Sequence, residues 1–417
     1  MNVQIFPASL HGKVCAPPSK SIAHRALICA ALARGKSTVS PVDLSKDMEA
    51  TIGALKAMGA SIIRKENEVT VTGIDTPPRQ TKIDCMESGS TLRFLIPIAA
   101  AKGMSCRFVG SGRLPEQPLA PYFDEFQKKG VYLDRKFIPL NLSGQLQPGL
   151  YTLPGDISSQ FITGLLFALP LLLEDSVITL STPLESAPYV DLTIDVLKKF
   201  GVHIFREKDR FIIPGRQEYQ PQKFYVEADF SNAAFFLTAS AFGNNVKVHG
   251  LSSDSLQGDR KILDILSSFG ASTVLENGFV STTQSLSRPA EIDGRDIPDL
   301  LPILCVAAAA APGRTVIHGT KRLKIKESDR AAAMVDGLSR LGGQIREESD
   351  QLIIDGGKPL HGATVSSYGD HRIVMSMAIA ACLTDSPIII EGAQAVEKSY
   401  PGFFEDFKAL GGIVHVI

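Results

Sequence analysis

Basic side chains stand at the starts of several apolar segments of helical length. Lys20 and Arg25 open the segment "SKSIAHRALICAALARG", and His371 and Arg372 open "GDHRIVMSMAIAACL". A helix N-terminus carries partial positive charge, so a cation placed there costs about 0.3–1 kcal/mol unless an anion also binds. Helix N-termini with added Lys and Arg are ready sites for phosphate and carboxylate groups. The pattern therefore predicts that this chain binds small anions.

Further cations occupy comparable positions. Arg93 follows "ESGST", Lys326 and Arg330 lie in "KIKESDR", and Lys398 lies in "VEKSYPGF". One such motif alone would be explained by ordinary helix caps and solvated cations. Recurrence at several helix starts favours anion binding, because unit charges about 4 Å apart attract by roughly 4 kcal/mol at an effective dielectric near 20.

Acidic residues accompany these cations. Glu327 lies between Lys326 and Arg330, and Asp299 precedes an apolar helix. Either acid has an ordinary explanation in the first turn of a helix. Because a carboxylate beside an anion site repels the ligand, proton transfer is the second interpretation. His24 alone is interpreted as a surface histidine with satisfied hydrogen bonds.

The elements that must position these residues repeat along the chain. Six polar clusters followed by apolar runs begin near residues 20, 88, 158, 229, 298 and 370. Between them lie amphipathic helices, each expected to end at a glycine that caps it in the left-handed conformation: Gly59, Gly130, Gly201, Gly270, Gly342 and Gly411. Short β-branched strands and hairpin patterns complete each copy. The predicted unit is strand, helix, strand, helix, strand, strand.

Six copies of about 70 residues account for all 417 residues. The last copy ends at "GIVHVI" with a single hairpin strand, and we expect "VQIFPA" at the start of the chain to supply its partner. A unit of this size is bulkier than a solenoid repeat, so compact groups of copies are expected.

Composition excludes several classes of function. The chain has 43 basic and 44 acidic residues, so it lacks the positive surplus that a nucleic-acid partner requires. The start of the chain does not resemble a secretion signal, and the apolar run 161–173 is too short to cross a bilayer. Six cysteines show no metal-binding spacing, and Cys305 and Cys382 are expected in the core. We therefore expect a reduced, cytoplasmic protein without a metal.

The ordered motifs "SKSIAHRA", "SGSTLR", "SSQF", "SAPYVD", "KIKESDR", "YGDHR" and "EKSYPGF" resemble the EPSP synthase family of enolpyruvyl transferases over nearly the whole chain. The resemblance implies an α/β fold, a two-domain inside-out α/β barrel with three copies of the β-α-β-α-β-β unit per domain. Residues 18–226 would form an N-terminal domain that mainly binds shikimate 3-phosphate. Residues 1–17 plus 227–417 would form a C-terminal domain that mainly binds phosphoenolpyruvate, with the active site in the cleft between the domains.

The reaction implied is transfer of the enolpyruvyl group of phosphoenolpyruvate to the 5-hydroxyl of shikimate 3-phosphate, through a tetrahedral intermediate and with release of phosphate. This step belongs to chorismate and aromatic amino acid biosynthesis in the shikimate pathway. The resemblance also implies no metal or organic cofactor, no nucleic-acid or membrane partner, a cytoplasmic monomer, and glyphosate as a competitor of phosphoenolpyruvate.

The resemblance assigns roles residue by residue. The implied catalytic residues are Lys20, Asp299 and Glu327, with Asp299 as the base at the hydroxyl and Glu327 or Lys20 handling the methylene proton. The implied ligands of shikimate 3-phosphate are Lys20, Ser21, Arg25, Ser158, Ser159, Gln160, Ser186, Tyr189, Asp299 and Lys326. The implied ligands of phosphoenolpyruvate are Lys20, Gly89, Gln117, Gln160, Arg330, His371, Arg372 and Lys398.

The chain departs from the family pattern near one substrate. Glu87 stands where the family often has Asn, and Gln117 where it commonly has Arg. Arg113 is the candidate substitute cation. Gly89 keeps the small residue associated with glyphosate binding, whereas Phe94 differs from the Pro or Leu of many relatives. Glyphosate sensitivity therefore stays open.

Other functions remain as alternatives. The sister enzymes that act on UDP-N-acetylglucosamine carry a catalytic Cys in the loop matching residues 110–119, and this chain has no Cys between 107 and 304. A non-catalytic anion-binding relative, or one that processes RNA ends, is a second alternative. The neutral net charge disfavours RNA, and the presence of Lys20, Asp299, Glu327 and Lys398 together favours catalysis.

Overall fold

A computed structural model describes residues 1–283 and 285–417. Over this part of the chain the strands form six four-stranded sheets, all with one strand order. The first two strands of each copy are parallel, and the hairpin formed by the last two packs antiparallel beside the second. The predicted β-α-β-α-β-β unit and the α/β class are confirmed.

The described chain divides into two compact units. The N-terminal unit is Pro18–Val226, and the C-terminal unit joins Met1–Pro17 to Glu227–Ile417. The elements of the N-terminal unit are α1 (Lys20–Leu32), β3 (Lys36–Ser40), α2 (Lys46–Ala57), β4 (Ser61–Lys65), β5 (Glu68–Thr72), β6 (Gln80–Asp84), α3 (Gly89–Ala101), β7 (Ser105–Val109), α4 (Ala120–Phe126), β8 (Val131–Leu133), β9 (Leu140–Gly144), β10 (Gly149–Leu153), α5 (Ser159–Ala168), β11 (Ser176–Leu180), α6 (Ala187–Lys199), β12 (Phe205–Glu207), β13 (Arg210–Ile213) and β14 (Lys223–Tyr225).

The C-terminal unit contains the remaining strands and helices. They are β1 (Val3–Phe6), β2 (His11–Cys15), α7 (Phe230–Ala241), β15 (Asn245–His249), α8 (Ile262–Ser268), β16 (Ser272–Glu276), β17 (Phe279–Thr283), β18 (Glu291–Asp293), α9 (Leu301–Ala310), β19 (Gly313–His318), α10 (Arg330–Arg340), β20 (Gln344–Glu348), β21 (Gln351–Gly356), β22 (Thr364–Ser366), α11 (His371–Ala380), β23 (Ile388–Glu391), α12 (Phe403–Ala409) and β24 (Ile413–Val416).

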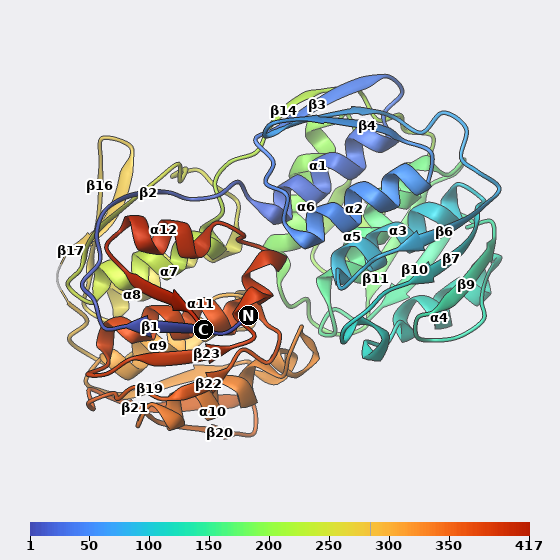
Figure 1. Ribbon diagram of the computed structural model, residues 1–417. Helices are drawn as coiled ribbons and strands as arrows, with labels where there is room; N and C mark the ends of the chain where they lie inside the picture. The colour runs from blue at the N-terminus through green and yellow to red at the C-terminus, as the bar shows by residue number, and fades with distance from the viewer. Residues whose placement is uncertain (284) are drawn as a thin grey trace. The chain divides into compact units, whose positions relative to one another are not determined.

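Some sheets take a strand from a distant part of the sequence. β1 pairs antiparallel with both β23 and β24, which confirms that the start of the chain completes the last copy, and Figure 1 shows the two chain ends side by side. β2 precedes α1 in the sequence but pairs with β15 of the C-terminal unit. Conversely, β14 precedes α7 but pairs with β3 of the N-terminal unit. The contiguous repeat alone does not predict this exchange, but the domain bounds implied by the family resemblance place residues 1–17 in the C-terminal domain and residues 18–226 in the N-terminal domain.

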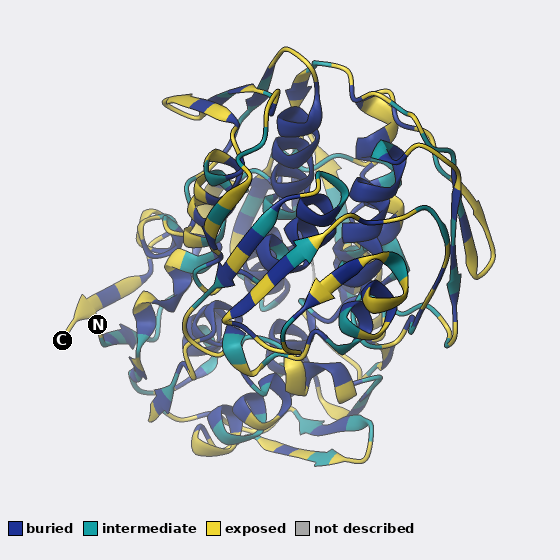
Figure 2. Cartoon of the chain, turned by 90° about the vertical axis from the view of Figure 1, so that its right-hand side faces the viewer, coloured by how far each residue is buried: buried dark blue, intermediate teal, exposed yellow. Residues whose placement is uncertain are grey.

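The first helix of each copy is enclosed by its own unit. α1, α3 and α5 in the N-terminal unit, and α7, α9 and α11 in the C-terminal unit, are buried along nearly their whole length. Figure 2 shows such helices in dark blue, while the sheets alternate between dark blue and yellow or teal. A helix that is apolar on all sides must lie in a core, and an alternating strand covers a core with one face. Helices inside and sheets outside are the predicted inside-out arrangement.

The two cysteines expected in the core differ in their burial. Cys305 of α9 is fully buried, as expected, whereas Cys382 packs at the margin of the core and is partly exposed. Within residues 1–283 and 285–417, no helix has the length and apolar character that crossing a membrane requires.

Gly73, directly after β5, gives a test of the packing between hairpin and buried helix. A Cβ added there would lie 1.8 Å from the carbonyl oxygen of Ala33, beyond the end of α1. We predict that Gly73→Ala lowers the free energy of unfolding of the N-terminal unit by about 1–3 kcal/mol, because overpacking forces the backbone to move. Urea denaturation followed by circular dichroism measures this change.

Gly53→Ala is the matched control. Gly53 lies on the exposed face of α2, and a Cβ there has nothing within 4 Å. This variant should gain about 0.5–1 kcal/mol from the better helix propensity of Ala. Equal stability of the two variants would contradict the assigned packing of Gly73.

Candidate active site

The N-terminus of α1 is arranged to receive a ligand. Ser19 is its N-cap residue, but the side chain makes no capping hydrogen bond, and the first turn carries no acid. The Ser19 hydroxyl is buried and finds no hydrogen-bond partner among the described residues. Helix N-termini usually have their amide groups satisfied by such a side chain. A first turn without a side-chain cap and without an acid suits an anion.

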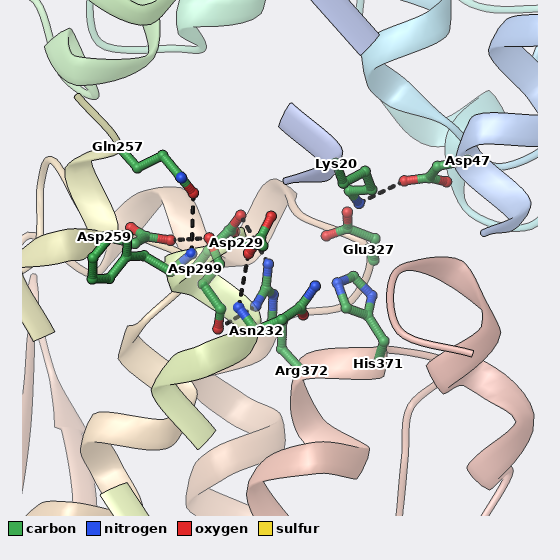
Figure 3. Close-up of polar contacts among 12 residues, drawn as sticks. Lys20, Asp47, Asp229, Asn232, Gln257, Asp259, Asp299, Glu327, His371 and Arg372 are labelled. Carbon is green, nitrogen blue, oxygen red and sulfur yellow. Dashed lines mark hydrogen bonds and ion pairs between the residues drawn. The ribbon is translucent and has the colours of Figure 1, made fainter. Parts of the chain in front are cut away.

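Lys20 lies in that turn and is held by an acid from the next helix. Its Nζ is 2.8 Å from Oδ2 of Asp47, in the first turn of α2, and both side chains are largely buried. Figure 3 shows this pair, in which the ammonium group and the carboxylate point toward each other. The pair fixes the direction of the Lys20 side chain and partly balances its charge.

Arg25 is buried one turn further along α1. Its guanidinium donates to Thr193 Oγ1 at 2.8 Å, to the Ser21 carbonyl at 2.7 Å and to the Tyr189 carbonyl at 3.0 Å. It also lies over the ring of Phe94, with 5.4 Å between Cζ and the ring centroid. Burial lowers the pKa of Arg25 to about 10, so it stays protonated at neutral pH. These contacts bring α1 and the start of α6 to one buried cation.

Three predicted serines stand at helix starts of the N-terminal unit. Ser158 caps α5 by accepting from the Gln160 amide, and Ser159 is the first residue of that helix. Ser186 is the N-cap of α6 in a left-handed conformation, and its side chain makes no capping hydrogen bond. Hydroxyl groups at helix starts are suitable ligands for phosphate oxygens.

Arg93 is a contact residue that the sequence did not assign. Its Nη1 donates to Oε1 of Gln160 at 2.7 Å, and its Nη2 donates to Oε1 of Gln117 at 2.8 Å. A Cβ on Gly89 would lie 2.6 Å from Nη1 of Arg93, so the absence of a side chain at position 89 makes room for the guanidinium. The sequence signal that could have identified Arg93 as a contact residue is its position near a helix start, four residues after Gly89.

The structure shows what surrounds Gln117 and Glu87, the two residues that depart from the family pattern. Arg113, considered as a substitute cation, pairs instead with Glu116 at 3.2 Å in an exposed position, whereas Arg93 contacts Gln117. The exposed Glu87 lies against Gly112, where an added Cβ would be 2.3 Å from its Oε2. The cation beside Gln117 therefore comes from α3 rather than from the neighbouring loop.

The interpretation of His24 as a surface residue is wrong. Its side chain is 1% exposed, and its Nδ1 lies 2.7 Å from Oγ1 of Thr51 on α2, which is 2.7 Å from Oγ1 of Thr91 on α3. Burial, with the charges of Lys20 and Arg25, lowers the pKa of His24 well below its usual value. His24 is therefore neutral and joins α1 to α2 and α3. Periodicity alone did not reveal this, because α1 is buried on every side.

A second cluster of predicted residues surrounds Arg330 in the C-terminal unit. Within the described residues, the Arg330 guanidinium meets three carboxylates, with distances of 2.7 Å from Nη1 to Asp299, 2.8 Å from Nη2 to Glu327 and 2.8 Å from Nε to Asp370. Arg330 itself is 1% exposed. Burial alone would lower its pKa, but these carboxylates raise the pKa of Arg330 well above its usual value. Arg330, Asp299, Glu327 and Asp370 are called the Arg330 cluster below.

Asp370 joins the Arg330 cluster to the start of α11. Its Oδ1 accepts from the Arg372 amide at 2.8 Å as the N-cap of the helix, while its Oδ2 accepts from Arg330 and from the Ser328 hydroxyl. His371 is buried beside it, with 3.7 Å between Nδ1 and the Asp370 Oδ1. One carboxylate thus fixes the starts of both α10 and α11.

Asp299 lies between cations. The Arg372 Nη2 is 3.6 Å from its Oδ2, whereas Arg330 contacts its Oδ1. Burial would raise the pKa of Asp299, but Arg372, Arg330 and Lys326 together hold it well below its usual value. Burial lowers the pKa of Lys326 to about 8, against the attraction of Asp299 and with repulsion from Arg330. Asp299 is therefore an ionised carboxylate that can accept a proton.

Lys398 approaches the same helix start from another segment. It ends the 3₁₀ helix η7 (Ala393–Lys398), and its Nζ donates to the Gly369 carbonyl at 2.7 Å, directly before Asp370. The sequence-predicted residues therefore fall into one cluster at the starts of α1, α3, α5 and α6 and a second at the starts of α10 and α11. Among the described residues, no group of three or more His, Cys, Asp or Glu side chains is arranged to hold a metal ion.

Comparison with known proteins identifies the family. The family model of EPSP synthase (3-phosphoshikimate 1-carboxyvinyltransferase) matches residues 6–407. The chain belongs to this family. A 3-phosphoshikimate 1-carboxyvinyltransferase of Clostridium kluyveri is 45% identical over 414 residues, which cover 98% of this chain and 97% of the relative. One from Clostridioides difficile is 44% identical over 427 residues, covering 99% and 98%.

Solved structures agree with the fold of this EPSP synthase family. The EPSP synthase of Acinetobacter baumannii superposes with a TM-score of 0.82 at 27% identity, over 100% of both chains. The enolpyruvyl transferase NikO of Streptomyces tendae superposes with a TM-score of 0.79 at 17% identity, covering 99% and 98%, and shows the fold alone. The resemblance inferred from the motifs is therefore confirmed.

His24 gives a pH-dependent test of the N-terminal unit. The folded unit keeps His24 neutral, whereas the unfolded chain protonates it below its ordinary pKa of about 6.5. The unfolded state then binds more protons, so we predict that stability falls by up to about 1.4 kcal/mol per pH unit as the pH drops below that value. His24→Gln should reduce this loss, as measured by urea denaturation at several pH values.

His203→Gln is the control for this experiment. His203 is exposed and belongs to the same unit. Its replacement should leave the pH dependence of stability as in the unmodified chain. If His24→Gln also left the slope unchanged, His24 would have to be protonated in the folded unit.

Proposed function

We propose that this chain transfers the enolpyruvyl group of phosphoenolpyruvate to the 5-hydroxyl of shikimate 3-phosphate, giving 5-enolpyruvylshikimate 3-phosphate and phosphate. The observation that carries the proposal is the Arg330 cluster, in which the carboxyl groups of Asp299 and Glu327 lie in contact with a buried cation. Cations of this kind attract anionic substrates, and the adjacent carboxylates can move protons. The 3-phosphoshikimate 1-carboxyvinyltransferases that resemble the chain support the choice of substrates.

The cluster of the N-terminal unit suits a phosphorylated acceptor. Arg25 presents a buried guanidinium beside the starts of α1 and α6, and Ser158, Ser159 and Ser186 place hydroxyl groups at helix starts. We assign the phosphate group of shikimate 3-phosphate to these residues. Because fixed hydrogen-bond donors cost little reorganisation, they bind a phosphate firmly in one orientation.

The acceptor hydroxyl must lose its proton as it attacks. In our proposal Asp299 accepts the proton of the 5-hydroxyl, while the oxygen adds to C2 of phosphoenolpyruvate. Arg330 and Arg372 keep Asp299 ionised before the substrates bind. When the same cations also bind the anionic groups of phosphoenolpyruvate, their hold on Asp299 weakens and its basicity increases. Lys326, with a pKa of about 8, is a suitable partner for a neighbouring hydroxyl.

The methylene carbon must gain a proton and then lose one. Glu327 contacts Arg330 at 2.8 Å and is about one-third exposed, which leaves it accessible to substrate. Lys20 is the second candidate, held by Asp47. Addition gives a tetrahedral intermediate, and loss of a C3 proton with departure of phosphate restores the double bond in the product. Fixed cations stabilise the departing phosphate.

The remaining ligands of phosphoenolpyruvate follow from the same assignment. We assign its anionic groups to cations and amide groups of both clusters: Lys20, Gly89, Gln117, Gln160, Arg330, His371, Arg372 and Lys398. Arg93 joins them as the cation that contacts Gln117 and Gln160. We also propose that the chain acts as a monomer in the cytoplasm, where charged metabolites of a biosynthetic pathway are available. Analytical ultracentrifugation checks the monomer.

An assay of phosphate release tests this function. The purified chain is given phosphoenolpyruvate with either shikimate 3-phosphate or UDP-N-acetylglucosamine as acceptor. We expect phosphate release with shikimate 3-phosphate alone, because the chain lacks a Cys between 107 and 304. Turnover with the nucleotide sugar would instead support the sister activity, and release with neither would contradict the proposal.

Glu327→Gln separates binding from proton transfer. The amide keeps the size of the side chain and a hydrogen-bond acceptor for Arg330, but it does not exchange a proton at neutral pH. We predict that kcat falls by about 10²–10⁴-fold, while the KM of both substrates changes little. The exposed Glu348→Gln on β20 is the control and should retain full turnover. Unchanged kcat in Glu327→Gln would remove Glu327 from the mechanism.

A further inference from the structure

Asp259 is a buried carboxyl group that the proposed reaction does not use. It lies in the 3₁₀ helix η4 (Gly258–Lys261), and its side chain is 2% exposed. The Ser231 hydroxyl, in the first turn of α7, donates a hydrogen bond to its Oδ2. Burying an ionised carboxylate is unfavourable unless it is paired or protonated. The proton content of Asp259 is therefore sensitive to the charges around it.

A series of contacts leads from Asp259 to the predicted base. The Ser231 carbonyl oxygen accepts from Arg372 Nη1 at 3.0 Å. The Arg372 Nη2 in turn lies 3.6 Å from Oδ2 of Asp299. Figure 3 draws Asp259, Asp299 and Arg372 together near the start of α7. Ser231 thus connects Asp259 to Arg372, the cation assigned to phosphoenolpyruvate. Its hydroxyl contacts Asp259, and its backbone carbonyl contacts Arg372.

Charges from several elements act on this carboxyl group. Burial raises its pKa to about 7, and the negative charges of Asp299 and Asp229 raise it as well. The Ser231 hydrogen bond and the positive charge of Arg372 lower it. The other charged side chains of η4, Arg260 and Lys261, are exposed. Asp259 therefore changes its protonation state in the neutral range.

We propose that Asp259 is a positioning residue whose proton sets how strongly Arg372 attracts the anionic substrate. When Asp259 is protonated, Asp299 is the one of these two carboxyl groups that carries a negative charge and attracts Arg372. With Asp259 ionised, a second negative charge attracts Arg372 and repels the incoming anion. The substrate therefore binds more tightly to the protonated form, and binding above neutral pH is accompanied by proton uptake at Asp259.

The identity of the anion as phosphoenolpyruvate rests on the proposed function. The first measurement is the KM for phosphoenolpyruvate at saturating shikimate 3-phosphate, from about pH 6 to about pH 8.5. If only the protonated form binds, the contribution of Asp259 raises KM by at most about 30-fold over this range, for a pKa of about 7. The substrate phosphate and Lys326 also titrate, so each variant is compared with the unmodified chain.

Three variants separate positioning from a merely structural role. Asp259→Asn mimics the protonated side chain and should remove the contribution of Asp259 to the rise in KM. Ser231→Ala removes a hydrogen bond that lowers the Asp259 pKa, so the rise should begin at a higher pH. Asp264→Asn changes an exposed carboxylate on the neighbouring α8 and should match the unmodified chain.

Infrared difference spectroscopy gives a readout that does not require turnover. A protonated carboxyl band should disappear as the pH rises through neutrality, should be absent in Asp259→Asn, and should persist to higher pH when inorganic phosphate is added. A chain that is inactive yet shows this titration would contradict the proposed function and support the inference.

The inference is overturned by either of two results. One is an active chain in which Asp259→Asn keeps the full pH dependence of KM. The other is an infrared titration that lacks the Asp259 band or does not respond to phosphate. If Asp259→Asn does not fold, Ser231→Ala serves as the test. A rise in KM that begins at a lower pH, or at the same pH, than in the unmodified chain contradicts the proposal.

Discussion

The C-terminal unit is organised around one buried cation. Arg330 lies in the interior with the carboxylates of Asp299, Glu327 and Asp370 in contact with its guanidinium. Taking an ion pair out of water is costly unless its geometry satisfies most of its hydrogen-bonding groups, and removing one partner leaves an uncompensated buried charge. The planar guanidinium can meet carboxylates on several edges at once, which a lysine ammonium cannot do in the same fixed geometry. The starts of α10 and α11 are consequently placed by a charge as well as by apolar packing.

In the N-terminal unit, two helices begin without a hydrogen bond from the side chain of the N-cap residue. The side chain of Ser19 does not cap α1, and that of Ser186 does not cap α6. His24, Thr51 and Thr91 hold the helices together behind these open ends through hydrogen bonds between neutral groups. Neutral groups do not compete with Lys20 and Arg25 for an anion. Ion pairs therefore hold the helix starts of the C-terminal unit, whereas hydrogen bonds between neutral groups join the helices of the N-terminal unit.

Much of this architecture follows from the sequence. Glycines spaced by about 70 residues, with apolar and amphipathic helices between them, predict six copies of one unit, and the unpaired strand of the last copy predicts the position of β1. The helix-start pattern predicts the cations of both clusters, whereas the serines, Gln160 and Tyr189 were implied only by the family resemblance. These features depend on local patterns, which periodicity and capping rules describe well.

Other features depend on three-dimensional packing and escaped prediction. His24 lies on a helix that is buried on all sides, so no apolar face could reveal its environment. Arg93 was recognised as a cation, but its contacts with Gln117 and Gln160 join segments far apart in sequence. Asp259 precedes an amphipathic helix and gives no local signal of burial. The repeat alone does not reveal the exchange of β2 and β14, because each strand sits at its expected place along the chain, and only the domain bounds implied by the family resemblance indicate it.

The place of β1 and β2 has a consequence for how the protein is made. Residues 1–17 leave the ribosome before their partners, which include β15 and the strands β23 and β24. At about 5–20 residues per second, the emerging N-terminal strands wait roughly 20–80 s before the last of these partners exists. During that interval Pro18–Val226, a contiguous stretch, can close its own core, including β14. β2 can therefore pair as soon as β15 has been translated, whereas β1 lacks both of its neighbouring strands until β23 and β24 follow.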